Sequence, residues 1–148
     1  IDAASYDLVR IAAGVPAYPN ELNGELHPLE IGLRESINFK KGCYVGQEVV
    51  ARLDAYDKVQ RQLVLLAVQD YRDAGGEPVE VILGDQTLGH VTSVSHPLSD
   101  GGRLALAICR KGSHTEPGTE LRIRAGAQTG AAHVRQFLGS DVLHPERF

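Results

Sequence analysis

The chain has 148 residues, of which 43% are hydrophobic and 23% are charged, an ordinary balance for a soluble globular protein of one domain or two small ones. Its net charge of -4 argues against a nucleic-acid groove, because phosphate binding depends on clustered lysine and arginine. The longest apolar run, "LVLLAV", is strand-sized, well short of the roughly 18 residues of a membrane-spanning helix. We therefore expect neither a direct nucleic-acid partner nor a membrane.

The two cysteines, Cys43 and Cys109, do not make a disulfide framework or a four-ligand zinc site. The histidines show no metal-ligand spacing, so no metal site is expected. A reducing cytoplasm is the expected compartment. The sequence contains no methionine and begins "IDAASYD", and we expect it to be a C-terminal piece of a longer polypeptide.

The first 56 residues have a helical, loop-rich pattern. "SYDLVRIAAGVP" predicts a short helix capped by Ser5, with Leu8, Ile11 and Ala12 on one face and the glycine and proline ending it. "HPLEIGLRESI" predicts a second helix with its proline in the first turn, where a missing N–H costs nothing. "GQEVVARLDAY" predicts a third, with its valines and leucine on one face.

After residue 56 the pattern becomes that of β-strands separated by turn signals. Hydrophobic side chains alternate at Val79, Val81 and Leu83, and Leu121 and Ile123 alternate with arginines. Six short strands in about 90 residues fit a small barrel or jelly roll. The predicted strands are "RQLVLLAVQ", "EPVEVIL", "QTLGHVTSVS", "GRLALAICR", "GTELRIRA" and "AAHVRQFL".

Several stretches resemble one protein family. "KGCYVGQE" resembles the signature of the YgfZ-type folate-binding proteins, which are relatives of the glycine-cleavage T-protein, an aminomethyltransferase. "DLVRIAAGVPAYPNEL" and "HPLEIGL" resemble segments next to that family's folate site. "LGHVTSVSHPL" and "RKGSHTEPGTELRI" resemble its C-terminal barrel, so the resemblance covers nearly the whole chain.

The resemblance implies an α+β fold. Residues 1–56 would be the helical and loop-rich end of the folate-binding middle domain, and residues 57–148 a six-stranded antiparallel β-barrel. It also implies tetrahydrofolate as the cofactor. The T-protein's catalytic aspartate would lie outside this chain.

Two charged residues match positions of the family's ligand site. Glu30 matches the glutamate that accepts two parallel donors from the pterin; alternatively, it only stabilises the start of its helix. Arg61 lies where the T-protein has a basic residue that meets the folate's acidic tail; alternatively, it is a solvated arginine at a strand end.

Other residues near these positions are weaker candidates. Tyr18 and Tyr44 could stack on the pterin or the aminobenzoyl ring, or simply pack. His27 is the one histidine close to Glu30 in sequence, and a loop position explains it equally well. Ala12 stands where relatives commonly have an acidic residue, so any contribution of that acid to folate binding is absent.

Cys43 is predicted to be a functional thiol, with Lys41 beside it. Positive charge and the amides of the predicted helix near Gly46 would favour the thiolate. Cys109 alternates with alanines on a predicted strand, which is the pattern of a packing residue. The alternative is that Cys43 is buried and inert in a tight turn.

Two functions remain open. The resemblance to YgfZ implies a folate-binding accessory protein in iron–sulfur cluster assembly or repair, acting on iron–sulfur client proteins and thereby on tRNA modification. The alternative is a folate-dependent aminomethyltransferase of the T-protein type, and whether the protein is an enzyme at all stays open. The cysteine motif favours the first, because the T-protein lacks it at this position.

Overall fold

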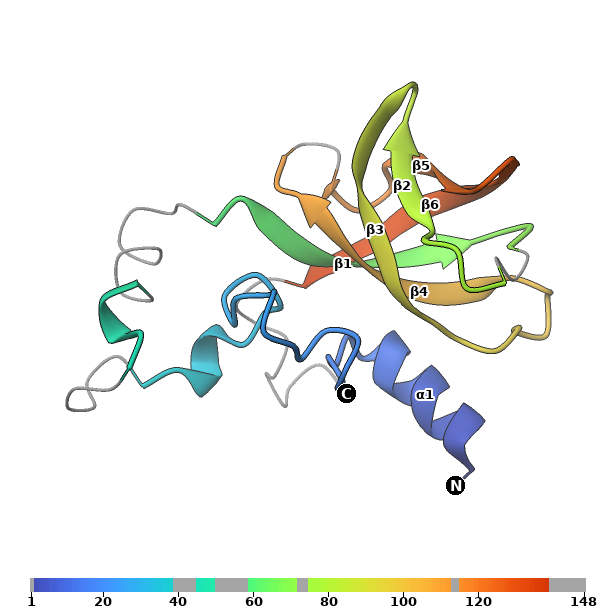
Figure 1. The fold of residues 1–148 in the computed structure, drawn as a ribbon. Helices are drawn as coiled ribbons and strands as arrows, with labels where there is room; N and C mark the ends of the chain where they lie inside the picture. The colour runs from blue at the N-terminus through green and yellow to red at the C-terminus, as the bar shows by residue number, and fades with distance from the viewer. Residues whose placement is uncertain (1, 39–44, 50–58, 72–74, 113–114, 139–148) are drawn as a thin grey trace.

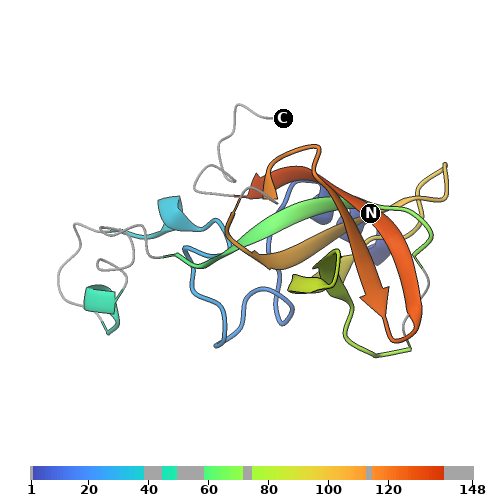
Figure 2. The ribbon, with the colours of Figure 1, turned by 90° about the horizontal axis from the view of Figure 1, so that it is seen from above.

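The structure is a computed structural model that describes residues 2–38, 45–49, 59–71, 75–112 and 115–138. An N-terminal segment, residues 2–38, contains the helix α1 (Ala3–Ala12) and the 3-10 turn η1 (Arg34–Ser36), and lies along one side of a β-barrel (Figure 1, Figure 2). The strands are β1 (Arg61–Val68), β2 (Glu80–Leu83), β3 (Gln86–Val94), β4 (Arg103–Arg110), β5 (Glu120–Ala125) and β6 (Gln128–Leu138).

The six strands form a closed barrel in the order β1-β4-β3-β2-β5-β6, and every neighbouring pair is antiparallel. Pairing of β1 with β6 closes it, which leaves no open sheet edge. Each of the six predicted strands overlaps an observed one. The prediction of a helical and loop-rich segment followed by a six-stranded antiparallel barrel is confirmed.

The barrel interior is filled by side chains that alternate along the strands. On β5, Leu121 and Ile123 are buried inside, whereas Arg122 between them is exposed, as the sequence predicts. On β2 the predicted alternation fails at Leu83, which is 45% exposed; it is the last residue of the strand and lies beyond the last β2 residue that pairs with β5. The buried interior consists of Val64, Leu66, Val68, Val79, Val81, Leu88, Ala105, Ala107, Cys109, Leu121, Ile123, Ala132 and Val134.

Strands β1 and β4 are buried on both faces, and together they form what we call the β1–β4 wall. On the inner face, Val64 and Ala107, for example, lie inside the barrel. On the outer face, a separate cluster joins the wall to Ile11 and Ile31 of the N-terminal segment. The wall residues of this cluster are Leu63, Leu65, Leu106 and Ile108. Burying a leucine or isoleucine side chain contributes about 1.5–3 kcal/mol. The N-terminal segment therefore covers the outer face of the wall, and this is why "LVLLAV" reads as one continuous apolar run.

Helix α1 forms as predicted but differs in two details. Its cap is Asp2, whose Oδ1 accepts from Ser5 N at 2.7 Å, so Ser5 is the third helical residue and not the cap. Ile11 is fully buried as expected, whereas Ala12 is exposed and does not share its face. The helix ends before Gly14, whose φ of 70° suits glycine.

The second predicted helix does not form. Residues 28–32 make turns, and only η1 is helical, in 3-10 form. Glu30 N donates to the His27 carbonyl at 2.8 Å, a tight turn, and Gly32 has a φ of 76°, which breaks an α-helix. Of the third predicted helix, Gly46 lies in a turn, residues 47–49 are helical and residues 50–56 lie outside the described residues, as does the proposed boundary near residue 56.

Across the stretches that the structure describes, no helix is both long and apolar enough to cross a membrane.

Gly89 sets how closely β3 can approach β4. A Cβ atom at this position would lie 1.9 Å from the carbonyl oxygen of Ile108 and 2.8 Å from Cα of Cys109. Both atoms belong to the backbone, so Gly89→Ala should force the two strands apart and lower the free energy of unfolding by about 3 kcal/mol, measured by urea denaturation.

The matched control is Gly24→Ala, because no atom lies within 4 Å of a Cβ added at Gly24. Equal urea midpoints for Gly89→Ala and Gly24→Ala would contradict the close approach of β3 to β4 at Gly89.

Candidate functional site

An ion pair between Glu30 and Arg61 lies where the N-terminal segment meets the start of β1. Arg61 Nε donates to Glu30 Oε1 at 2.8 Å, and Nη2 donates to Oε2 at 2.9 Å. Nη2 also donates to the carbonyl oxygen of Glu25 at 3.2 Å. These hydrogen bonds to the Glu30 carboxylate raise the pKa of Arg61 above its ordinary value. Two parallel bonds of this kind fix the plane of the guanidinium.

The two members of the pair differ in their exposure. Glu30 is 9% exposed, and its carboxylate also accepts from the backbone N–H of His27 at 2.9 Å. Its carbonyl oxygen accepts from Leu63 N at 2.8 Å, which ties the turn to β1. The Arg61 side chain is 44% exposed. A molecule arriving from solvent therefore meets the guanidinium before it meets the carboxylate.

This pairing constrains the two sequence predictions for Glu30 and Arg61. The sequence assigns Glu30 to the pterin and Arg61 to the acidic tail, which are opposite ends of a folate. The structure joins the two side chains directly, so a single folate cannot hold its pterin on Glu30 while its tail lies on Arg61. Each assignment stays a prediction, and they concern alternative orientations of a ligand.

The remaining predicted site residues fall into two groups. Tyr18 lies in the loop after α1 with 82% of the residue exposed, so its ring faces solvent. His27 helps to shape the Glu30 turn, because its Nδ1 accepts from Leu29 N at 3.2 Å. Lys41, Cys43 and Tyr44 lie outside the described residues, and their roles stay predictions.

Cys109 has the packing role that the sequence predicts. It is 1% exposed within the barrel interior, and burial raises the pKa of its thiol to about 12. Because the thiolate is the reactive form, this thiol is unreactive at neutral pH in the folded protein.

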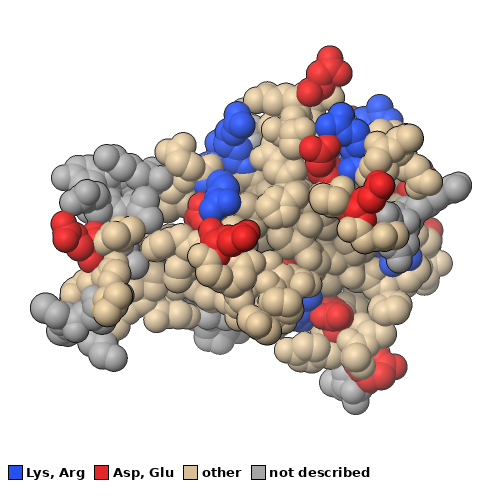
Figure 3. All heavy atoms as spheres, viewed as in Figure 1, with Lys and Arg blue, Asp and Glu red and all other residues tan. Residues whose placement is uncertain are grey.

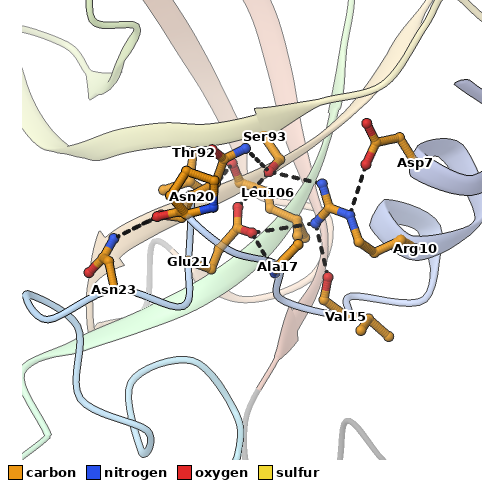
Figure 4. Close-up of polar contacts among 11 residues, drawn as sticks. Asp7, Arg10, Val15, Ala17, Asn20, Glu21, Asn23, Thr92, Ser93 and Leu106 are labelled. Carbon is orange, nitrogen blue, oxygen red and sulfur yellow. Dashed lines mark hydrogen bonds and ion pairs between the residues drawn. The ribbon is translucent and has the colours of Figure 1, made fainter. Parts of the chain in front are cut away.

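Sequence reasoning missed a buried polar network that joins the N-terminal segment to β3 (Figure 4). Arg10 donates through Nη1 to Glu21 Oε2 at 3.4 Å and through Nη2 to Ser93 Oγ at 3.1 Å. Ser93 Oγ in turn donates to Glu21 Oε1 at 2.7 Å. The backbone N–H of Ala17 also donates to the Glu21 carboxylate, and Arg10 Nε donates to the Asp7 carboxylate. The three central residues are each 6% exposed or less.

The network fixes the path of the chain after α1. Arg10 Nη1 also holds the Val15 carbonyl at 3.0 Å, and Asn20 Nδ2 donates to Ser93 Oγ at 3.0 Å. The sequence contains a partial indication that Arg10 is buried, because Arg10 precedes the buried Ile11 and lies at the edge of the apolar face of α1. Nothing local pointed to Ser93, which is 83 residues away.

Other features of the described residues do not add to this site. A groove of about 790 Å³ runs over β5 and β6 beside the end of β1, lined among others by Asp70, Glu120, Arg122 and His133. Of the predicted site residues that the structure describes, Tyr18, Glu30 and Arg61, none lines it. No group of three or more histidine, cysteine or acidic side chains in the described part of the chain could hold a metal ion.

No family model matches the chain, but individual proteins do. A putative chloroplastic transferase of Arabidopsis thaliana is 36% identical over 74% of this chain and 24% of its own length. The aminomethyltransferase of Moorella thermoacetica is 31% identical over 86% of this chain and 34% of its own length. The tRNA-modifying protein YgfZ of Aliivibrio fischeri is 34% identical over 72% of this chain and 35% of its own length.

A solved structure agrees with these sequence matches. The glycine cleavage system aminomethyltransferase T of Bartonella henselae superimposes with a TM-score of 0.68 over 88% of this chain and 36% of its own, at 21% identity, which supports the shared fold. The resemblance that the motifs indicate is confirmed. The chain spans between 24% and 36% of the length of these proteins.

The Arg10–Glu21 pair is expected to be essential to stability. Arg10→Ala leaves the fully buried Glu21 carboxylate without its cation, and breaking a buried pair in this way costs about 3–5 kcal/mol. The free energy of unfolding, from chemical denaturation, measures the effect.

Arg124→Ala is the control for this prediction. Arg124 and Glu80 also form an ion pair, at 2.6 Å, but both side chains are 39% exposed, and such pairs contribute about 0–1 kcal/mol. Similar losses of unfolding free energy in Arg10→Ala and Arg124→Ala would show that burial does not determine the cost of breaking an ion pair.

Proposed function

We propose that this relative of the aminomethyltransferases and of YgfZ binds a reduced folate, tetrahydrofolate, and that Arg61 receives the carboxylate tail of that ligand. The observation that carries the proposal is the bidentate pair, in which the buried Glu30 orients a guanidinium that is 44% exposed. A fixed guanidinium edge suits a carboxylate, which accepts two parallel hydrogen bonds. Glu30 acts in this arrangement as a positioning residue for Arg61.

Two aromatic side chains are part of the proposal. Tyr18, whose ring is exposed, and Tyr44 are proposed to stack on the pterin or on the aminobenzoyl ring. The opposite orientation puts the pterin at this locus, where its two donors would compete with Arg61 for the Glu30 carboxylate. Because that carboxylate already accepts three hydrogen bonds and is nearly buried, we favour the tail.

The wider function we propose is that of an accessory protein in iron–sulfur cluster assembly or repair, acting on client proteins in the cytoplasm and through them on tRNA modification. Two observations support it: the "KGCYVGQE" motif and the similarity to a protein named as tRNA-modifying. In this proposal Cys43 is the functional thiol and Lys41 favours its thiolate. The second candidate is a folate-dependent aminomethyltransferase, supported by the similarity to aminomethyltransferases in sequence and fold.

Substitution of Arg61 should separate the two orientations of the ligand. Arg61→Ala should weaken tetrahydrofolate binding by about one to two decades, because a charge-assisted pair contributes roughly 1.5–3 kcal/mol. Tetrahydropteroate, which lacks the glutamate tail, should bind the variant and the parent chain equally. Chemical-shift titration of the labelled chain measures both ligands even when binding is weak.

Arg124→Ala is the control for this titration, since it removes an arginine from a different ion pair on the barrel. If Arg61→Ala loses the same affinity for tetrahydrofolate and for tetrahydropteroate, the pterin end of the ligand lies at Arg61. Unchanged affinity for both would remove the Glu30–Arg61 pair from the ligand site.

The two thiols should differ in their reactivity. In the native chain Cys43 is expected to react with an alkylating reagent at neutral pH, with an apparent pKa below the ~8.5 of a free thiol. Cys109 should stay unmodified until the protein is denatured, because burial raises the pKa of its thiol to about 12. Mass spectrometry after pH-dependent labelling locates the modified residue, and faster labelling of Cys109 would overturn the assignment of Cys43.

A further inference from the structure

The groove on the outside of the barrel carries groups that the Glu30–Arg61 site does not use. Its volume of about 790 Å³ is within the range of ligand sites in proteins. It crosses the sheet from Gln69, which follows β1, over β6 and β5 to Leu83 at the end of β2. Neighbouring strands lie about 4.8 Å apart, so three strand spacings make the groove roughly 14 Å long.

Arg122 supplies a positive charge in this groove that no described carboxylate neutralises. Its side chain is exposed on the outer face of β5, and its Nη2 donates to Thr129 Oγ1, which holds the guanidinium toward β6. Within the described residues Arg122 makes no ion pair, whereas Arg124, two positions along the strand, is paired with Glu80 at 2.6 Å. The Arg122 guanidinium is therefore oriented and available to a ligand.

The side of the groove next to this guanidinium is apolar. Ile82 of β2 is the direct cross-strand partner of Arg122, and Leu83 follows it. Leu83 is 45% exposed, and in the part of the chain that the structure describes it is the one large hydrophobic side chain exposed on the barrel. Cross-strand partners lie about 5 Å apart, so a ligand with an acid on Arg122 can place an adjoining aliphatic group on this side.

The other side of the groove is acidic. Glu120 lies two positions before Arg122 on the same face of β5, and Asp70 lies across β6, just after β1. Neither carboxylate is paired with a described cation. Figure 3 shows acidic and basic side chains next to one another in the region where Figure 1 draws β2 and β5. A polyanion does not suit such a mixed surface, but a ligand that carries both charges does.

We propose that this groove binds the carboxyl terminus of a partner polypeptide that ends in an aliphatic residue and has a lysine or arginine two residues earlier. The terminal carboxylate accepts hydrogen bonds from the remaining donors of Arg122, because a guanidinium edge matches the two oxygens of a carboxylate. The aliphatic side chain packs on Leu83, and the basic side chain reaches Glu120 and Asp70. Three extended residues span about 10 Å, which the length of the groove accommodates.

The spacing in the groove favours a chain terminus over an internal acidic residue. At a terminus, one Cα atom carries both the carboxylate and the aliphatic side chain, and Arg122 and Ile82 are likewise adjacent. In an extended chain, an internal aspartate or glutamate and its direct neighbour point to opposite sides. Because neither Glu30 nor Arg61 lines the groove, the proposal does not depend on folate binding.

Chemical-shift titration of the labelled 148-residue chain with short peptides tests this proposal. The first probe is N-acetyl-Lys-Ala-Leu with a free carboxyl terminus, and the signals of the groove residues are expected to shift. Amidation of the terminus should weaken binding about tenfold, because it removes a charge-assisted contact. Replacing the leucine of the probe by glycine should weaken binding about fivefold. Replacing its lysine by glutamate should also weaken binding, through repulsion by the acidic side.

Arg122→Gln should weaken binding of the free-acid peptide about tenfold and leave binding of the amidated peptide unchanged. Arg135→Gln is the matched control, since Arg135 is exposed on β6 and does not line the groove. Equal affinity of the acid and the amide for the parent chain, or equal losses in Arg122→Gln and Arg135→Gln, would overturn the proposal. Shifts confined to residues outside the groove, or tighter binding of free leucine than of the peptide, would overturn it as well.

Discussion

The burial of β1 and β4 on both faces is the constraint on which the other features of this structure depend. The inner face of these strands fills the barrel, and the outer face needs a cover that the barrel itself does not supply. The N-terminal segment provides it through Ile11 and Ile31, and the Arg10–Glu21–Ser93 network adds a polar attachment to β3 beside the apolar one. Segment and barrel are therefore stabilised together.

The candidate site lies on the line where segment and barrel meet. Glu30 comes from the segment and Arg61 from the first position of β1, and the Glu30 carbonyl also accepts from Leu63 N. Neither half can form the bidentate pair without the other. The geometry of the guanidinium thus depends on correct docking of the segment, which in turn depends on the apolar contacts of the β1–β4 wall.

Local patterns in the sequence predicted the strands well. Turn signals and alternating residues such as Leu121 and Ile123 report the local backbone and the side of the barrel that each side chain faces. They did not predict the exposure of Leu83, because the point at which β2 runs past its partner β5 depends on a strand that is distant in sequence. The second predicted helix failed because Gly32 adopts a positive φ that an α-helix does not contain, and Ile31 is buried against the wall from a turn.

The sequence predicted Glu30 and Arg61 as separate site residues but did not predict that they pair with each other. A family motif pointed to Glu30 and the strand entry pointed to Arg61, yet the distance between them follows from tertiary packing across 31 positions. The polar network at Glu21 could not be predicted from the sequence, because it also depends on tertiary packing. A buried charge is identified by partners that are distant in sequence, such as Ser93, and no local window contains both.

The strand order has a consequence for synthesis of the protein on the ribosome. β1 is the first strand to be made, yet both of its neighbours, β4 and β6, come later. Its apolar residues stay without strand partners until much of the chain has been translated, and such segments are prone to aggregate. Polar and charged residues flank the run, with Arg61 and Gln62 before it and Gln69 and Asp70 after it. Flanking residues of this kind discourage pairing with other chains while the barrel is incomplete.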